Sequence, residues 1–79
     1  MHYQRVCIPL WALRHAAGDT IEYSVDTHPI GLELRAKMNT QLLHSQVFRD
    51  PDELMRSAER GRGLLESRGW TIIEAERKA

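Results

Sequence analysis

Two stretches of alternating side chains near the middle of the chain constrain its fold more than any other feature. In residues 20–26 the apolar side chains Ile21, Tyr23 and Val25 alternate with polar ones, and in residues 32–38 every second side chain is again apolar. A period of two places one set of side chains on each face of a β-strand. The sequence therefore predicts two half-buried strands, each with one face against a core.

The second of these strands is predicted to continue through a tight turn into a β-hairpin over residues 32–48. Asn39 and Thr40 suit a two-residue turn, because asparagine tolerates the positive φ that the favoured hairpin turns require. Residues 27–31, which include a proline and a glycine, form the connection before this hairpin.

The length of the turn determines which side chains of the last hairpin strand face the core. A two-residue turn places Leu43 and Val47 opposite the apolar side chains of residues 32–38. A three-residue turn would place His44 and Gln46 there instead. Because a slip of one residue moves every side chain to the other face, the two-residue register is favoured.

A well-marked helix follows the hairpin, over residues 51–68. Asp50 suits the N-cap, Pro51 suits the first helical position, and acidic residues occupy the first turn. Gly69 suits the position just after the helix. The apolar stripe of the helix consists of Leu54, Met55, Ala58, Gly61 and Leu65.

Two glycines inside this helix are unexpected, since each costs about 1 kcal/mol relative to alanine in a helix interior. The favoured interpretation is that Gly61 lets the helix lie close to the sheet and that Gly63 is simply tolerated. The alternative is a kink or a hinge at this point.

The N-terminal region admits two interpretations. Pro9 suits the first turn of a helix, and apolar residues follow at helical spacing up to a glycine, which predicts a short helix over residues 9–17. The competing interpretation continues a strand from residues 3–8 through Trp11 and Leu13, because proline is allowed at a sheet edge. The sequence leaves both open.

These features together predict a single small α+β domain over residues 1–79. Its antiparallel sheet has three to five strands, with the hairpin 32–48 at the centre and the helix 51–68 packed on one face. Residues 71–74 are a candidate for a further short strand, and residues 75–79 are expected to fray as a polar tail.

Length and composition restrict the class of protein. A single core in a chain of 79 residues supplies only about 3–5 kcal/mol of stability, so association with a second copy is expected. Eleven basic residues balance eleven acidic ones, which leaves no net field to hold a polyanion. Cys7 is the only cysteine, and no apolar run approaches the roughly 18 residues that a membrane span needs. We therefore expect a soluble, cytoplasmic protein.

No group of residues predicts catalysis or a bound metal. No two histidines lie two to five residues apart, as the local ligand pairs of zinc sites usually do. The dispersed candidates are Cys7, His2, His15, His28 and His44. Cys7 lies between apolar neighbours and is expected to be a buried, unreactive thiol. We predict no catalytic residue, no cofactor and no metal site, and an enzyme is not expected because a thin core leaves little room for a water-excluding pocket.

The outer face of the sheet is the remaining candidate for function, because one helix covers only one face. The predicted interaction face consists of Arg35, Lys37, Leu42, His44 and Phe48, with Trp11 beside them. Apolar side chains surrounded by charge favour a protein partner, most simply a symmetric homodimer. The main hypothesis is therefore a small non-enzymatic interaction module. The alternative is nucleic-acid binding through the same face, which the zero net charge and the neighbouring acidic residues disfavour.

The ββα order, with a charged hairpin that ends at Phe48-Arg49-Asp50-Pro51 before an amphipathic helix, resembles an arrangement found in several small bacterial domains. These include the DNA-arm-binding modules of integrases. The resemblance covers about half the chain and concerns topology alone, which does not by itself imply a function.

Overall fold

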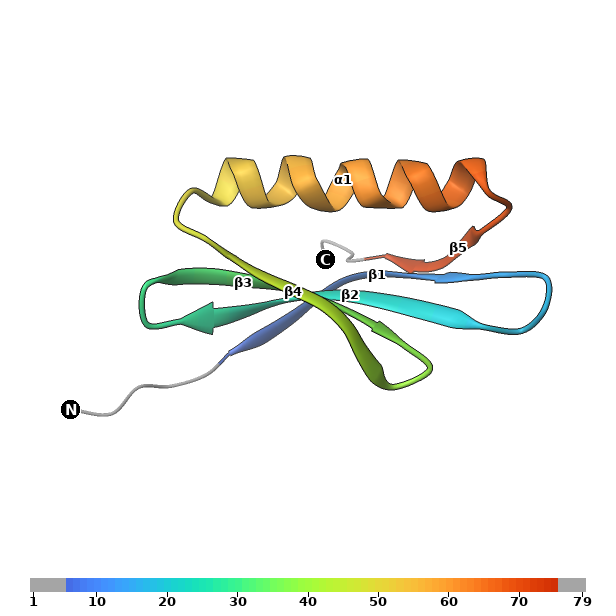
Figure 1. Cartoon of the computed structure of the whole chain (residues 1–79), viewed down its shortest axis with the longest axis horizontal. Helices are drawn as coiled ribbons and strands as arrows, with labels where there is room; N and C mark the ends of the chain where they lie inside the picture. The colour runs from blue at the N-terminus through green and yellow to red at the C-terminus, as the bar shows by residue number, and fades with distance from the viewer. Residues whose placement is uncertain (1–5, 76–79) are drawn as a thin grey trace.

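The computed structural model describes residues 6–75. The chain forms one five-stranded antiparallel sheet with a single helix on one face (Figure 1). This confirms the predicted α+β class. In chain order the elements are β1 (Cys7–Arg14), β2 (Thr20–His28), β3 (Gly31–Met38), β4 (Gln41–Phe48), α1 (Pro51–Ser67) and β5 (Thr71–Ala75).

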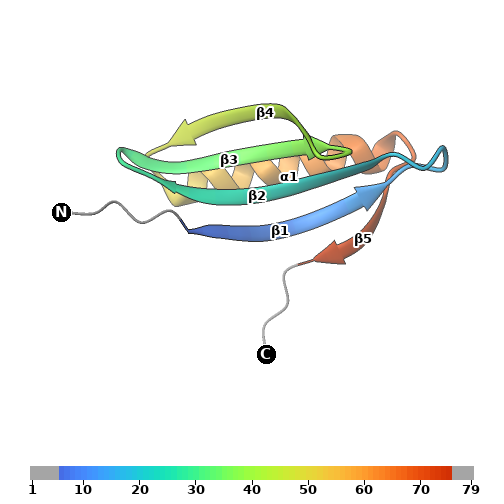
Figure 2. The ribbon, with the colours of Figure 1, turned by 90° about the horizontal axis from the view of Figure 1, so that it is seen from below.

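The first four strands follow one another as an antiparallel meander, and the helix then joins the two edges of the sheet. The strand order is β4-β3-β2-β1-β5, so α1 leaves one edge strand, crosses the sheet and delivers the chain to the other edge (Figure 2). The predicted strands over residues 20–26 and 32–38 are confirmed as β2 and β3, which lie in the interior of the sheet. The predicted central position of the hairpin 32–48 is wrong, because its second strand, β4, forms an edge and β2 is the middle strand.

The predicted helix over residues 9–17 is wrong, and the competing strand interpretation is right. Pro9 lies on β1, where it pairs with Ser24, while β5 covers only the later part of β1, from Trp11 to Arg14. No described strand therefore pairs with Pro9 on its other side, which is the edge position that proline tolerates. A β-bulge between Pro9 and Trp11 makes Leu10 an extra residue. Leu10 and Trp11 are consequently both buried, which breaks the alternation that would have indicated a strand.

The two-residue turn of the β3–β4 hairpin is confirmed, but the predicted inner face of β4 is wrong. Asn39 and Thr40 adopt positive φ angles of 51° and 73°, and Met38 pairs with Gln41. A β-bulge then inserts Leu43 as an extra residue in β4. The bulge shifts the later part of β4 by one residue, as a three-residue turn would have done.

Beyond this bulge the side chains of β4 have exchanged faces relative to the prediction. His44 pairs with Ala36 and Phe48 with Leu32, which places them on the helix side of the sheet. Val47 pairs with Glu33 on the opposite face. Phe48 packs against the core, and this contact accounts for the shifted register.

The helix has the ends that the sequence predicts. The Asp52 amide donates a hydrogen bond of 3.0 Å to the Asp50 side chain at the N-cap. At the other end Gly69 adopts a φ of 94°, and the Trp70 amide donates to the Leu65 carbonyl at 3.0 Å, which closes a Schellman motif. The helix ends one residue before the predicted 68, because Arg68 is its C-cap.

The core lies between α1 and the sheet and is centred on Leu10, Trp11, Leu13, Val25, Leu34, Leu54 and Ala58. Gly61 is the point of closest approach, since a Cβ atom there would lie 2.5 Å from the Tyr23 Oη atom. A Cβ atom at Gly63 would meet nothing within 4 Å. The favoured interpretation of the two glycines is therefore confirmed, and α1 runs as one unbroken helix (Figure 1).

The predicted strand over residues 71–74 is confirmed as β5, Thr71–Ala75, which pairs antiparallel with β1. Of the predicted polar tail over residues 75–79, Ala75 belongs instead to β5, where it pairs with Trp11, and residues 76–79 lie outside the described part of the chain. Within residues 6–75 no helix has the length and apolar character needed to cross a membrane.

Candidate functional site

The six residues of the predicted interaction face do not share one surface. Arg35, Lys37 and Leu42 lie on the outer face of the sheet, where Lys37 and Leu42 are register partners. His44 and Phe48 lie on the helix side of β4 because of the bulge at Leu43. Trp11 is only 8% exposed and belongs to the core. The structure therefore brings together three of the six.

Trp11 is held between the helix and the sheet by aromatic and cationic neighbours. Its ring centre lies 6.0 Å from that of Tyr23, and the Arg62 guanidinium carbon lies 5.1 Å from the Trp11 ring centre. Its indole Nε1 is buried and has no hydrogen-bond partner among the described residues. Trp11 thus contributes to packing and is not available to a partner on the outer face.

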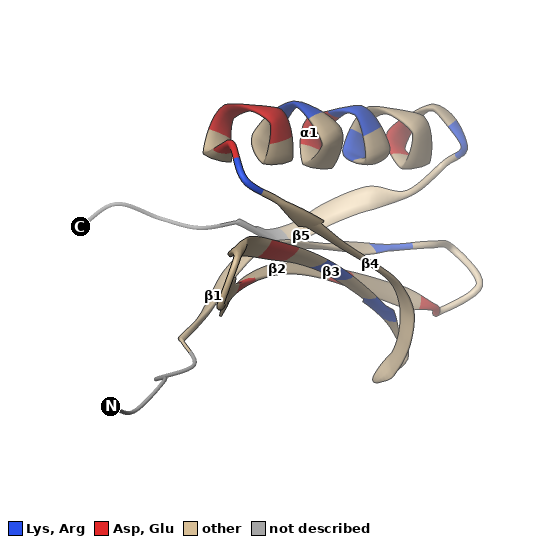
Figure 3. Cartoon of the chain, turned by 60° about the vertical axis from the view of Figure 1, so that its left-hand side comes forward, with Lys and Arg blue, Asp and Glu red and all other residues tan. Residues whose placement is uncertain are grey.

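The outer face of the sheet is concave and carries charges of both signs. Figure 3 shows the sheet curving away from α1, with basic and acidic positions on neighbouring strands. Arg35 Nη1 lies 3.4 Å from the Asp26 carboxylate, which is 3% exposed, and Lys37 is the register partner of Glu22. Basic side chains that face acidic neighbours across a sheet stabilise the strand pairing. They do not form a continuous basic surface.

The β4 strand is the most exposed element of the sheet. It lies at the edge, and its residues are exposed from Gln41 through Gln46. Its eight residues include no Asp, Glu, Lys or Arg and no proline. Along an antiparallel edge, alternate residues direct their backbone N–H and C=O groups away from the sheet. β4 is therefore an open, uncharged template for pairing with another strand.

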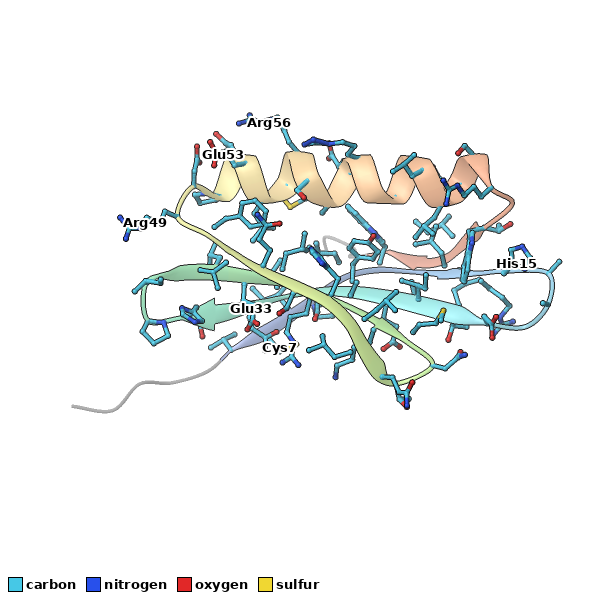
Figure 4. The ribbon with its side chains drawn as sticks, viewed as in Figure 1. Cys7, His15, Glu33, Arg49, Glu53 and Arg56 are labelled. Carbon is cyan, nitrogen blue, oxygen red and sulfur yellow. The ribbon has the colours of Figure 1, made fainter. Side chains whose placement is uncertain are left out.

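A groove runs between β4 and the N-terminal half of α1. Its volume is about 450 Å³, and it is open to solvent. The residues that line it are Gln46 and Phe48 from β4 and Glu53, Arg56, Ser57 and Arg60 from α1. Figure 4 shows Glu53 and Arg56 side by side on the first turns of α1, with both side chains extended into solvent. The groove adjoins the open edge, so the two form one continuous surface, which we name the β4 edge site.

The arginines of this site are not neutralised by neighbours. Within residues 6–75, neither Arg56 nor Arg60 forms an ion pair, although Glu53 lies on the same side of the helix. A pair of arginines four residues apart occupies one helix face and can hold a carboxylate through paired N–H donors. The β4 edge site therefore combines the exposed backbone of an edge strand with two arginines that form no ion pair among the described residues and one carboxylate, Glu53, so its side chains carry a net positive charge.

The histidines and Cys7 do not come together. Among the described residues, no group of three or more His, Cys, Asp or Glu side chains is placed to hold a metal ion. His15 packs against the Trp70 ring, with 5.2 Å between ring centres, and lies far from Cys7 along the sheet (Figure 4). Cys7 is exposed, so the expectation of a buried thiol is wrong: it lies at the start of β1, on the concave face that no element within residues 6–75 covers.

Sequence reasoning missed the β4 edge site. Arg56 and Arg60 lie on the side of α1 opposite its apolar stripe, where charged residues are ordinary and indicate no site. The available signal was the lack of charge over residues 41–48, which is unusual for a strand that ends up at an edge. That signal has no meaning until the strand order is known.

Comparisons with protein-family models, with curated proteins and with solved structures found no match to this chain. The functional argument therefore depends on the fold and on the chemistry of the chain's own residues.

Proposed function

We propose that this chain is a non-enzymatic protein–protein interaction module that associates by strand addition at β4. In the absence of another partner the added strand is the β4 of a second copy. The observation that carries the proposal is the character of β4: eight residues at a sheet edge, without charge or proline and exposed over most of their length.

Edge strands of monomeric proteins usually carry features that prevent such pairing. Common protective features are lysine or another charge, proline, short length, and bulges. β4 has one of these, the bulge at Leu43, and it lies near the turn, so the segment from His44 to Phe48 continues in regular register with β3. This segment is long enough to accept a partner strand.

Self-association through β4 has a simple symmetric geometry. Two antiparallel edge strands are related by a two-fold axis perpendicular to the sheet, which joins two five-stranded sheets into one of ten strands with both helices on the same side. The surface that a single strand pair buries is small for a stable complex, so we expect a dissociation constant of about micromolar order.

The size of the domain and its groove support a non-enzymatic role. The core is thin, with Leu13 and Leu54 as its largest fully buried side chains, so added strands stabilise the fold as well as the complex. The groove beside β4 is open and polar and does not exclude water from a bound substrate.

A cytoplasmic location is part of the proposal. Cys7 is a single, exposed thiol. In an oxidising compartment such a group would form intermolecular disulfides, so a reducing compartment suits this chain better. Association experiments should accordingly include a reductant.

The test is sedimentation equilibrium of the reduced protein at low micromolar concentration, comparing the wild type with the double variant Leu42→Lys/Ser45→Lys. Both side chains are exposed, and like charges on the two facing edges should weaken the dimer at least about tenfold. The new lysines also lie opposite Lys37 and Arg35, so circular dichroism of the variant must first show that the fold persists. The matched control is Thr71→Lys/Ile73→Lys on the opposite edge strand, β5, where both positions are also exposed. It should leave the association unchanged.

Three results would contradict the proposal. A wild-type monomer at all concentrations would exclude self-association, and an equal effect of the two lysine pairs would exclude β4 as the contact. Salt-sensitive binding of random DNA or RNA by the monomer would favour the nucleic-acid alternative instead.

A further inference from the structure

A strand added to β4 would extend the groove side of the sheet. Its side chains alternate between the two faces, so every second one lies on the side of α1, next to Gln46 and Phe48. That side faces the groove, whose wall on α1 includes Arg56 and Arg60 together with Glu53. The chemistry of this wall therefore selects among incoming strands.

A second copy of the chain matches this wall poorly. The β4 strand has no acidic residue, and the side chains that it presents on the helix side after the bulge are His44, Gln46 and Phe48. The β4 strand of a second copy thus brings no carboxylate to the two arginines, and Glu53 is the acidic residue that lines the groove. A strand that carries carboxylates at alternate positions supplies one, and Arg–carboxylate pairs are among the stronger polar contacts in proteins.

We propose that the preferred occupant of the β4 edge site is an extended acidic segment of a partner protein, bound as a sixth strand with alternate Asp or Glu side chains against Arg56 and Arg60. This inference rests on the proposed function, since it takes strand addition at β4 as the mode of binding. It specifies in addition that the preferred partner is acidic, and it predicts that an acidic strand displaces the second copy from β4.

The probes are two capped peptides of the length of β4, one of four Val-Glu repeats and one of four Val-Lys repeats. They share the alternating pattern and differ in the sign of charge. Binding is measured by isothermal titration, and displacement of the dimer by sedimentation. We expect the Val-Glu peptide to bind at least about tenfold more tightly than the Val-Lys peptide, to convert dimer to monomer, and to bind more weakly at high salt.

Reversing the charge of the groove arginines tests whether they cause the preference for the acidic peptide. The variant Arg56→Glu/Arg60→Glu should invert the order, so that the Val-Lys peptide binds more tightly. The matched control Arg14→Glu/Arg68→Glu changes the net charge equally at two exposed positions outside the groove and should retain the wild-type preference. N-acetylglutamate amide, which has the carboxylate without a strand, should not displace the dimer at the same carboxylate concentration.

Each failure has a distinct meaning. Equal binding of the two peptides, or a preference that the groove and control variants alter alike, overturns the acidic-partner inference and leaves strand addition standing if the lysine pair on β4 still disrupts the dimer. Displacement by N-acetylglutamate amide would also overturn it, because the site would then be a simple anion site. If the β4 lysine pair has no effect on association, the proposed function itself fails.

Discussion

The same helix closes tightly over one part of the sheet and leaves another part open. Over the inner strands, Leu54 and Ala58 are fully buried and Gly61 lies directly against Tyr23. Over β4, α1 leaves a polar groove of about 450 Å³ that is lined by long side chains. We refer to these two regions as the closed side and the open side.

The difference follows from the size of the residues on two faces of one helix. Ala58 and Gly61 are small and lie three residues apart, so the helix backbone can approach the sheet on that face. Arg56 and Arg60 are long and charged and must keep their guanidinium groups in water. The closed side therefore stabilises the fold, and the open side is free to bind. Four variants test this division, beginning with the largest expected effect.

Leu54→Ala should be the most destabilising of these changes. Leu54 is 1% exposed and is one of the two largest fully buried side chains, so its truncation should lower the free energy of unfolding by about 2–5 kcal/mol. Urea denaturation followed by circular dichroism measures the loss. The control is Leu64→Ala on the same helix, where the side chain is 55% exposed and the change should stay within about 0.5 kcal/mol. Similar losses for both would mean that the closed side does not hold the fold.

Gly61→Ala should destabilise the closed side by about 0.5–2 kcal/mol, because displacement of the Tyr23 ring that packs on Trp11 costs more than the helix propensity of alanine recovers. Adding Tyr23→Phe removes the nearest atom and should recover part of the loss. Gly63→Ala is the matched control, since its Cβ atom meets no neighbour, and it should stabilise the helix by about 0.5–1 kcal/mol. The same sign of change at both glycines would contradict the close approach at Gly61.

Asp50→Ala tests the junction where the open side begins. Asp50 ends the segment after β4 and caps α1 through its bond to the Asp52 amide, so its loss should cost about 1 kcal/mol. Asp50→Asn keeps the acceptor oxygen and should retain most of the stability. An unchanged denaturation midpoint for Asp50→Ala would show that the cap contributes nothing to the fold.

The smallest effect concerns the ionisation of Tyr23 on the closed side. Burial raises the pKa of the Tyr23 phenol above its ordinary value of about 10. The folded state then holds the phenol proton more tightly than the unfolded state. The stabilisation that this gives is fully present below about pH 10, the pKa of the unfolded chain, and is lost as the pH rises through the pKa of the folded state. Urea midpoints of the wild type and Tyr23→Phe should therefore differ by a constant amount below about pH 10 and by a changing amount as the pH rises above it, because only the wild type then loses stability. A difference that stays constant over both ranges would contradict burial of the phenol.

The facing of the side chains could be predicted in β2 and β3, which alternate regularly, and could not be predicted beyond the bulges in β1 and β4. β2 and β3 show an uninterrupted period of two because both lie inside the sheet with one covered face. β1 and β4 each contain an extra residue, Leu10 and Leu43, and the period is lost at that point. The position of a bulge depends on which side chains it allows the strand to bury, and this depends on the neighbouring strands rather than on the local sequence.

The residues of the predicted interaction face could likewise be placed only where the local sequence pattern decides which side of the sheet they face. Arg35, Lys37 and Leu42 were placed correctly on the outer face because they precede the bulge in the hairpin register. His44 and Phe48 follow the bulge and lie on the other face. Trp11 was assigned to the interaction face before its strand was known to pass under α1, where its indole is buried.

The sequence by itself determined the two central strands, the tight turn between β3 and β4, and both ends of α1. These features depend on contacts within a few residues: alternation, positive φ at Asn39, the Asp50 cap and the glycine at position 69. Only the tertiary structure decided that β4 lies at an edge, that β5 pairs with β1 at the other edge, and that the open side faces β4. Strand order and bulge position depend on which distant segments bury one another, and that choice is made by the whole core at once.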